Sequence, residues 1–149
     1  MKKILLFLSL VLMSSVLFAQ RDTPVEWSFE AVKVDAKQYD LVFTAEIDQN
    51  WYLYSQHIDE GGPIPTSFYF NVEDGFKPEG KTKEEGDNKE EGHDELFDMK
   101  VTTFKKKAVF TQRIKLSGKV DSVSGYLEFM TCNGEQCIPP TNVDFEIVL

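Results

Sequence analysis

The chain has 149 residues, with 25 Asp and Glu against 16 Lys and Arg, and a formal net charge of −9. That length suits one domain built around one hydrophobic core. So acidic a chain lacks the basic face that a nucleic-acid-binding protein needs, so that class is disfavoured. An acidic body would instead attract a basic surface on a partner.

The first nineteen residues have the layout of a signal peptide. Lys2 and Lys3 precede an apolar run over residues 4–12, and a small residue, Ala19, closes the segment. This pattern predicts export, with a signal peptide over residues 1–19, cleavage after Ala19 and a mature domain over residues 20–149. The alternative is an uncleaved N-terminal anchor, although the run is short for a membrane span, which needs about 20 apolar residues.

Alternating apolar residues predict strands along most of the mature chain. A further short piece at Phe76-Lys77-Pro78 is expected at a sheet edge, because proline cannot donate to a strand ladder. The seven or eight expected strands, with no amphipathic helix, predict an all-β fold, an immunoglobulin-like antiparallel sandwich of two sheets. The expected strands cover residues 27–31, 39–47, 51–58, 68–70, 108–116, 123–129 and 143–149. The residues expected to face inward are Phe29, Leu41, Phe43, Ile47, Phe110, Ile114, Leu127 and Phe145.

Residues 79–92 form a contrasting segment that contains no apolar side chain. Such a segment cannot bury surface against a core. We therefore expect a solvated and mobile loop here.

Cys132 and Cys137 are the only cysteines, and an Asn-Gly pair follows the first of them. Asn-Gly favours a hairpin with a type I′ turn, which needs positive φ at both central residues. The cysteines are then expected on facing strand ends, about 4.5–5.5 Å apart at Cβ, where a disulfide can form. So short a loop stabilises the fold by only about 2 kcal/mol. The bond could serve chemistry or be a plain structural disulfide of an exported protein, and spacing alone favours the structural disulfide.

The segment from Cys132 through Cys137 to Pro139-Pro140 resembles the redox loop of the N-terminal periplasmic domain of the thiol:disulfide interchange protein DsbD. Residues Trp51–Ile58 are similar to the tyrosine-containing strand of that family, and Asp94–Lys100 resemble its acidic and aromatic cap loop. The three matches occur in the family's order. The chain departs from the family pattern in a cysteine loop that is one residue shorter and in a cap without Phe-Tyr-Gly. Since residues 20–149 contain no membrane or thioredoxin-like segment, we expect either that the membrane donor is a separate chain or that this chain is a stand-alone relative with another task.

The resemblance implies a thiol–disulfide interchange protein of the periplasm, a component of protein-disulfide reductase type. It would take electrons from a membrane-embedded thiol reductant and pass them to thioredoxin-fold proteins, such as disulfide isomerases and cytochrome c maturation reductases. Cys137 would form the mixed disulfide with a partner, Cys132 would resolve it, and no cofactor would be needed. The residues expected around this pair are Phe97 as its cap, Tyr52 and Tyr54 beside it, and Asp94 and Glu95 as nearby acids.

Other interpretations of the same residues remain. The protein could be a non-catalytic immunoglobulin-like binding module, in which Phe97, Tyr52 and Tyr54 are ordinary packing residues. His57 and His93 complete a nominal set of two cysteines and two histidines, but their spacing is not that of a zinc site, so no metal is expected. Acids near the sulfurs would disfavour the thiolate, so exchange should be slow outside a complex.

Overall fold

The computed structural model describes residues 23–72, 75–86 and 88–149, so the predicted signal peptide lies outside the described residues. Within these ranges no helix is long and apolar enough to span a bilayer. The described residues form ten strands rather than the expected seven or eight. They are β1 (Val25–Lys33), β2 (Gln38–Ile47), β3 (Tyr52–Tyr54), β4 (Ser67–Phe70), β5 (Phe76–Glu85), β6 (Lys89–Asp94), β7 (Met99–Phe104), β8 (Lys107–Leu116), β9 (Ser122–Cys132) and β10 (Cys137–Val148).

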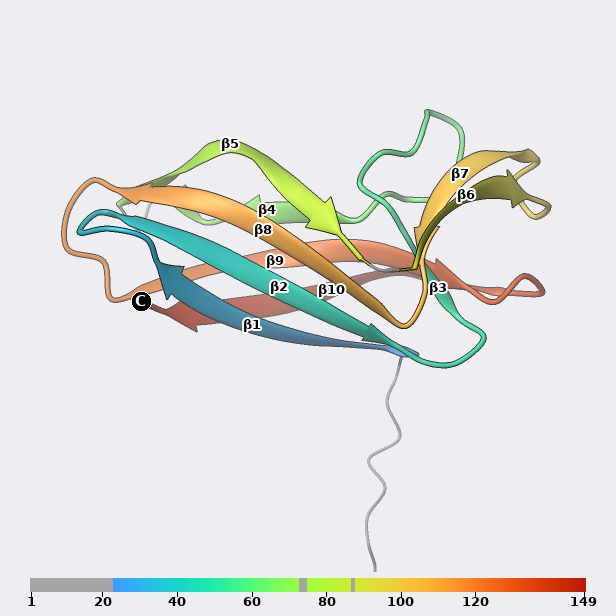
Figure 1. Ribbon diagram of the computed structural model, residues 1–149, viewed down its shortest axis with the longest axis horizontal. Coiled ribbons are helices and arrows are strands. Elements are labelled where there is room, and N and C mark those ends of the chain that lie inside the picture. The colour runs from blue at the N-terminus through green and yellow to red at the C-terminus, as the bar shows by residue number, and fades with distance from the viewer. Residues whose placement is uncertain (1–22, 73–74, 87) are drawn as a thin grey trace, which may run out of the picture.

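The strands form two antiparallel sheets that face each other, which confirms the predicted all-β sandwich (Figure 1). One sheet has the order β1-β2-β8-β5. The other has the order β10-β9-β3-β7-β6, and β4 pairs with the first part of β9, next to β3 along the same side. The long β9–β10 hairpin therefore extends along the whole second sheet and ends at the β6–β7 end of the molecule.

The space between the sheets is filled by aromatic and aliphatic side chains. All the predicted inward-facing residues are buried, except Phe29, which is half-buried and packs against the core. Phe43 is fully buried and contacts the rings of Phe68 and Phe145 at centroid distances of 4.7 and 5.0 Å. Alternation along each strand produced this result, because successive side chains point to opposite faces of a sheet.

The prediction of a loop over residues 79–92 is wrong, because β5 and β6 occupy most of this segment. Both are edge strands of their sheets, and each pairs through its backbone with one neighbour, β8 or β7. An edge strand needs few apolar side chains, since its hydrogen bonds hold it and most of its side chains meet water. Glu84 of β5 shows that this segment is ordered and not a solvated loop. Its carboxylate accepts hydrogen bonds from the Ser55 hydroxyl at 2.5 Å and the Gln56 amide at 2.9 Å.

Two further expectations about strand ends need correction. The strand expected over 51–58 is regular only at Tyr52–Tyr54. Two adjacent prolines most simply end a strand, because proline has no backbone N–H to donate, yet Pro139 and Pro140 lie within β10. β10 is an edge strand, and its register with β9 shifts between Ile138 and Thr141, so the missing proline donors break no regular ladder.

Candidate redox site

The two cysteines close the hairpin between β9 and β10. Cys132 is the last residue of β9 and Cys137 the first of β10; they are register partners, joined by a disulfide, with Cα atoms 4.1 Å apart. The predicted facing positions are confirmed. The predicted type I′ turn is wrong, because four residues separate the strands and, of the Asn-Gly pair, Gly134 alone has positive φ. The Asn133 side chain sets the turn instead, accepting hydrogen bonds from the amides of Glu135 and Gln136 at 3.0 and 2.9 Å.

The two cysteine residues differ in their exposure to solvent. Cys132 is 0 % exposed, whereas Cys137 is half-buried at the rim of the molecule. β3 lies on the other side of Cys132, with Tyr52 as its register partner, and the Thr131 hydroxyl donates to the Tyr52 carbonyl at 2.7 Å. Part of Cys137 is therefore exposed at the surface, whereas no part of Cys132 is.

Around the disulfide the structure forms a second apolar cluster, separate from the core between the sheets. Its buried members are Tyr54, Val101 and Cys132. Phe97 is half-buried against this cluster, with its ring edge-on to Tyr54 at 6.1 Å between centroids. The structure thus brings the predicted cap residue and both predicted flanking tyrosines together with the cysteines. The half-buried members are Tyr52, Ile58, Phe97, Met99, Met130 and Cys137.

Asp94 connects the turn at residues 95–98, which carries Phe97 and is the cap turn of this site, to Tyr52 and Tyr54. Its Oδ2 accepts hydrogen bonds from the Tyr54 hydroxyl at 2.6 Å and the Tyr52 hydroxyl at 3.2 Å. Its Oδ1 accepts from the backbone amides of Leu96 and Phe97 at 2.9 and 3.3 Å. The carboxylate is buried, so one side chain holds the turn that carries Phe97 and orients both phenols.

The Tyr54 hydroxyl oxygen also lies 3.2 Å from Cys132 Sγ. Burial raises the pKa of Tyr54, and its hydrogen bond to Asp94 raises that pKa further. Burial likewise raises the pKa of Tyr52. Both phenols therefore stay protonated, and the single Tyr54 proton is committed to Asp94. A Cys132 thiolate would gain no full hydrogen bond from Tyr54 and would face a carboxylate beyond it, which disfavours the charged sulfur.

Glu95 is at the edge of the site and not inside it. Its side chain is exposed and lines a cleft of about 280 Å³ together with Tyr52, Glu90 and Gly134. In the described part of the chain, no group of three or more His, Cys, Asp and Glu side chains could hold a metal ion. His93 lies 3.2 Å from Asp98 on the surface of the cap turn.

Sequence reasoning did not assign Met99 and Met130 to the site. Both are half-buried against the disulfide cluster. The signal for Met130 was present, because it lies two residues before Cys132 on a strand and so shares its face. A signal for Met99 was present too, because it lies within the segment Asp94–Lys100 that resembles the family's cap loop, and in the structure it is the register partner of Asp94.

The chain matches the family model described as "Thiol:disulfide interchange protein DsbD, N-terminal" over residues 21–149. No curated protein sequence matches it. Among solved structures it is similar to the reduced DsbD N-terminal domain of Neisseria meningitidis, with 18 % identity, a TM-score of 0.54 and 83 % of each chain covered. It is also similar to the N-terminal periplasmic domain of ScsB from Proteus mirabilis, with 16 % identity and a TM-score of 0.57. That match covers 82 % of this chain and 44 % of the ScsB chain. At these identities the structural matches speak for the fold, and they support its immunoglobulin-like assignment.

Proposed function

Because the chain belongs to the family of the DsbD N-terminal domain, we propose that it relays electrons by thiol–disulfide exchange in the periplasm. A membrane-embedded thiol reductant of the DsbD type, on a separate chain, reduces the Cys132–Cys137 bond. The resulting dithiol reduces periplasmic thioredoxin-fold proteins. The protein thus acts as a component of protein-disulfide reductase type, and the cysteine pair is its redox centre, with no further cofactor.

The observation that carries this proposal is the unequal exposure of the two cysteine residues. Exchange requires that a thiolate attack one sulfur of the disulfide in line with the bond. Cys137 is half-buried at the rim, whereas Cys132 is fully buried beside Tyr54. The geometry supports Cys137 as the sulfur that bonds to partners and Cys132 as the one that leaves and later resolves.

The exchange steps follow from that assignment. On reduction, a donor thiolate bonds to Cys137 Sγ and the Cys132–Cys137 bond breaks, so that Cys132 leaves with the electron pair and takes up a proton. The second donor thiol then attacks the donor sulfur of the mixed disulfide and releases Cys137. Two electrons and two protons pass from donor to protein, and the same steps in reverse reduce an acceptor disulfide.

The surroundings of the pair make it selective. Phe97 and the cap turn restrict access to the sulfurs, and access is one determinant of exchange rate. The carboxylate of Asp94, hydrogen-bonded to Tyr54, disfavours a thiolate at Cys132. Reaction with small oxidants should therefore be slow, and a partner that displaces the cap or brings positive charge should accelerate it.

Trapping tests the assignment of the sulfurs. In a Cys132→Ser variant, an oxidised thioredoxin-fold protein should form a stable mixed disulfide through Cys137. The matched Cys137→Ser variant should form little, because Cys132 is buried. Equal trapping by both variants would contradict the assignment.

The reduction potential of the Cys132–Cys137 bond distinguishes a disulfide that relays electrons from one that is only structural. After equilibration with glutathione or a thioredoxin-type dithiol buffer, we expect a potential above about −300 mV, the region below which structural disulfides typically lie. A lower value would favour the alternative of a non-catalytic binding module, in which the bond only closes the hairpin.

A further inference from the structure

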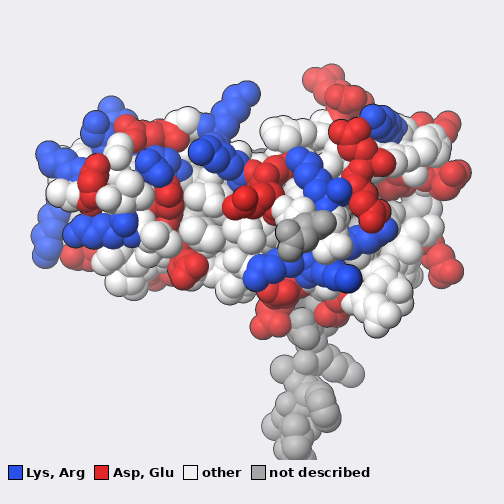
Figure 2. Space-filling view, in the orientation of Figure 1, with Lys and Arg blue, Asp and Glu red and all other residues white. Residues whose placement is uncertain are grey.

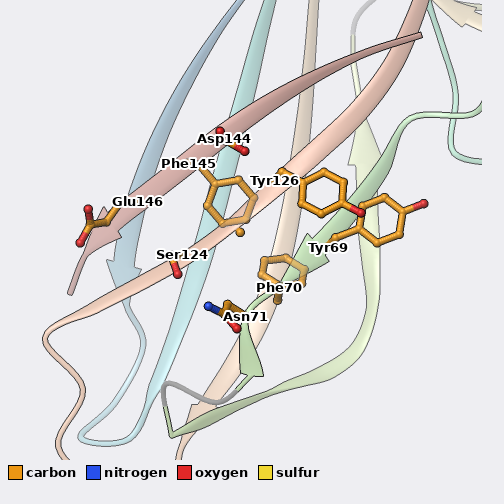
Figure 3. A pocket seen from close by; sticks show the side chains of 9 residues that line it. Tyr69, Phe70, Asn71, Ser124, Tyr126, Asp144, Phe145 and Glu146 are labelled. Carbon is orange, nitrogen blue, oxygen red and sulfur yellow. The ribbon is translucent and has the colours of Figure 1, made fainter.

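The outer face of the six-stranded sheet has a second feature, remote from the disulfide. A groove of about 700 Å³ lies where β4, β9 and β10 run side by side. Figure 3 shows the rings of Tyr69 and Tyr126 next to each other, with Asp144 and Glu146 on the neighbouring strand β10. No step of the exchange reaction uses these residues.

Gly125 makes this groove possible. A Cβ at this position would lie 2.1 Å from the Tyr69 carbonyl oxygen and 2.7 Å from Cζ of Phe145. Only a residue without a side chain lets β4 and β9 approach this closely. Phe70 and Phe145 then line the groove beneath the missing side chain.

The two tyrosines form an exposed aromatic platform. Their rings stack with centroids 4.6 Å apart and an interplanar angle of 15°, and the side chains are 43 % and 38 % exposed. Tyr126 is the register partner of Tyr69 on one side and of Asp144 on the other. Two ring faces and a carboxylate thus lie in one row across three strands, an arrangement that attracts a Lys or Arg side chain.

The charge around the platform has one sign. Strands β4, β9 and β10 contain no Lys or Arg, while Glu128, Asp144 and Glu146 lie on them. Asp144 makes no ion pair with any described residue. The opposite face, over β2, β5 and β8, mixes basic and acidic side chains (Figure 2). The β4–β9–β10 face is therefore complementary to a cationic segment.

This face is continuous with the disulfide. Side chains two residues apart on a strand share a face, so Tyr126, Glu128, Met130 and Cys132 follow one another along β9. Tyr126 and Cys132 are then roughly 20 Å apart along the strand, from a rise of about 3.4 Å per residue. A protein of ordinary size that reaches Cys137 also covers this distance.

We propose that the face formed by Tyr69, Tyr126, Glu128 and Asp144 docks a Lys- or Arg-bearing segment of the protein that exchanges electrons with Cys137. A cationic side chain of that segment lies against the tyrosine rings and pairs with Asp144. This inference rests on the proposed function, because its occupant is the exchange partner itself.

Two synthetic dithiol peptides test the docking face. Each carries Cys-Gly-Pro-Cys and a ten-residue Gly/Ser linker, whose end-to-end distance of about 16–19 Å spans the face. One ends in Arg-Lys-Arg and the other in Glu-Asp-Glu. We measure the second-order rate at which each reduces the oxidised protein. The basic peptide should react about tenfold faster at low salt, and the difference should shrink at high salt because screening weakens exposed charge pairs.

Matched variants locate the effect. Asp144→Lys and Tyr126→Thr should remove most of the advantage of the basic peptide. Glu30→Lys makes the same charge change on β1 of the other sheet, at an exposed position, and should retain the advantage. Dithiothreitol has no cationic segment and should reduce all these proteins at one rate, which also shows that the variants are folded around an intact disulfide.

The outcomes separate the two proposals. Equal rates for both peptides, or an advantage lost as much in Glu30→Lys as in Asp144→Lys, would overturn the docking face and leave the relay standing. A reduction potential in the structural range would overturn the relay, and the docking proposal with it.

Discussion

The core between the sheets and the cluster around the disulfide are built on different principles. The core is packed with apolar side chains, such as Phe43, whose neighbours are other rings. The disulfide cluster instead contains polar groups: the Tyr54 hydroxyl donates to the Asp94 carboxylate and lies 3.2 Å from Cys132 Sγ. The core is stabilised by the burial of apolar side chains, which reduction of the disulfide does not change. The disulfide cluster contains the bond that reduction breaks. Stability and reactivity are thus assigned to separate parts of one small domain.

Phe43→Ala provides the largest test of this separation. Phe43 is fully buried and touches four other rings, so its truncation leaves a cavity that should cost about 3–5 kcal/mol of unfolding free energy. Denaturant unfolding measures this loss. The rate at which a dithiol reduces the remaining folded protein should not change. A changed rate would mean that the two regions are coupled.

Replacing both cysteines, Cys132→Ser with Cys137→Ser, should have a smaller effect on the fold. The closed loop is short, so its loss should cost about 2 kcal/mol of unfolding free energy, while every exchange reaction disappears. Comparing unfolding of this variant with that of the oxidised and reduced wild-type protein measures the effect. A loss as large as that of Phe43→Ala would mean that the bond holds the domain together.

Glu84 links the two sheets outside both the core and the disulfide cluster. It lies on β5 and accepts hydrogen bonds from Ser55 and Gln56, which follow β3. Burial raises its pKa, but hydrogen bonds from Ser55, Gln56 and Lys89 lower it more, so the net shift is downward. A lowered folded-state pKa stabilises the fold above the ordinary value of 4.5, and this contribution is lost as the pH falls below it.

Glu84→Gln should therefore lower the unfolding free energy by about 1–2 kcal/mol at pH 7. The difference from the wild-type protein should shrink as the pH falls below 4.5 and the wild-type carboxyl takes up its proton. Unfolding curves at several pH values measure both. A difference that persists in acid would show that the charge of Glu84 is not the cause.

Phe97→Ala should change stability least and reactivity most specifically. Phe97 is half-buried, so its removal should cost about 1 kcal/mol, while the reduced cysteines should react about threefold to tenfold faster with a small alkylating reagent. Leu96→Ala is the matched control, because the adjacent Leu96 is 45 % exposed and is not packed against the cluster. Equal rates in the two variants would mean that Phe97 does not cover the sulfurs.

Part of this arrangement was readable from the sequence. The alternation of apolar and polar residues identified the inward faces of β2 and β8. The spacing of Cys132 and Cys137 predicted that these two residues face each other across a hairpin. Edge strands were harder to detect: β5 and β6 have few or no inward apolar side chains to report their periodicity, and they are held by backbone hydrogen bonds that any sequence can make. The predicted turn type was wrong because hydrogen bonds to the Asn133 side chain determine the conformation of this loop, and the backbone preference of Asn-Gly does not.

The sequence by itself determined the all-β sandwich, its core residues and the pairing of the two cysteines, because these depend on local alternation and short spacing. The tertiary structure decided that Asp94 accepts hydrogen bonds from tyrosines 40 and 42 residues away, and that Cys132 is fully buried while Cys137 is half-buried. It also placed Tyr69 beside Tyr126. Contacts of this kind depend on which strands become neighbours, and no local pattern encodes that choice.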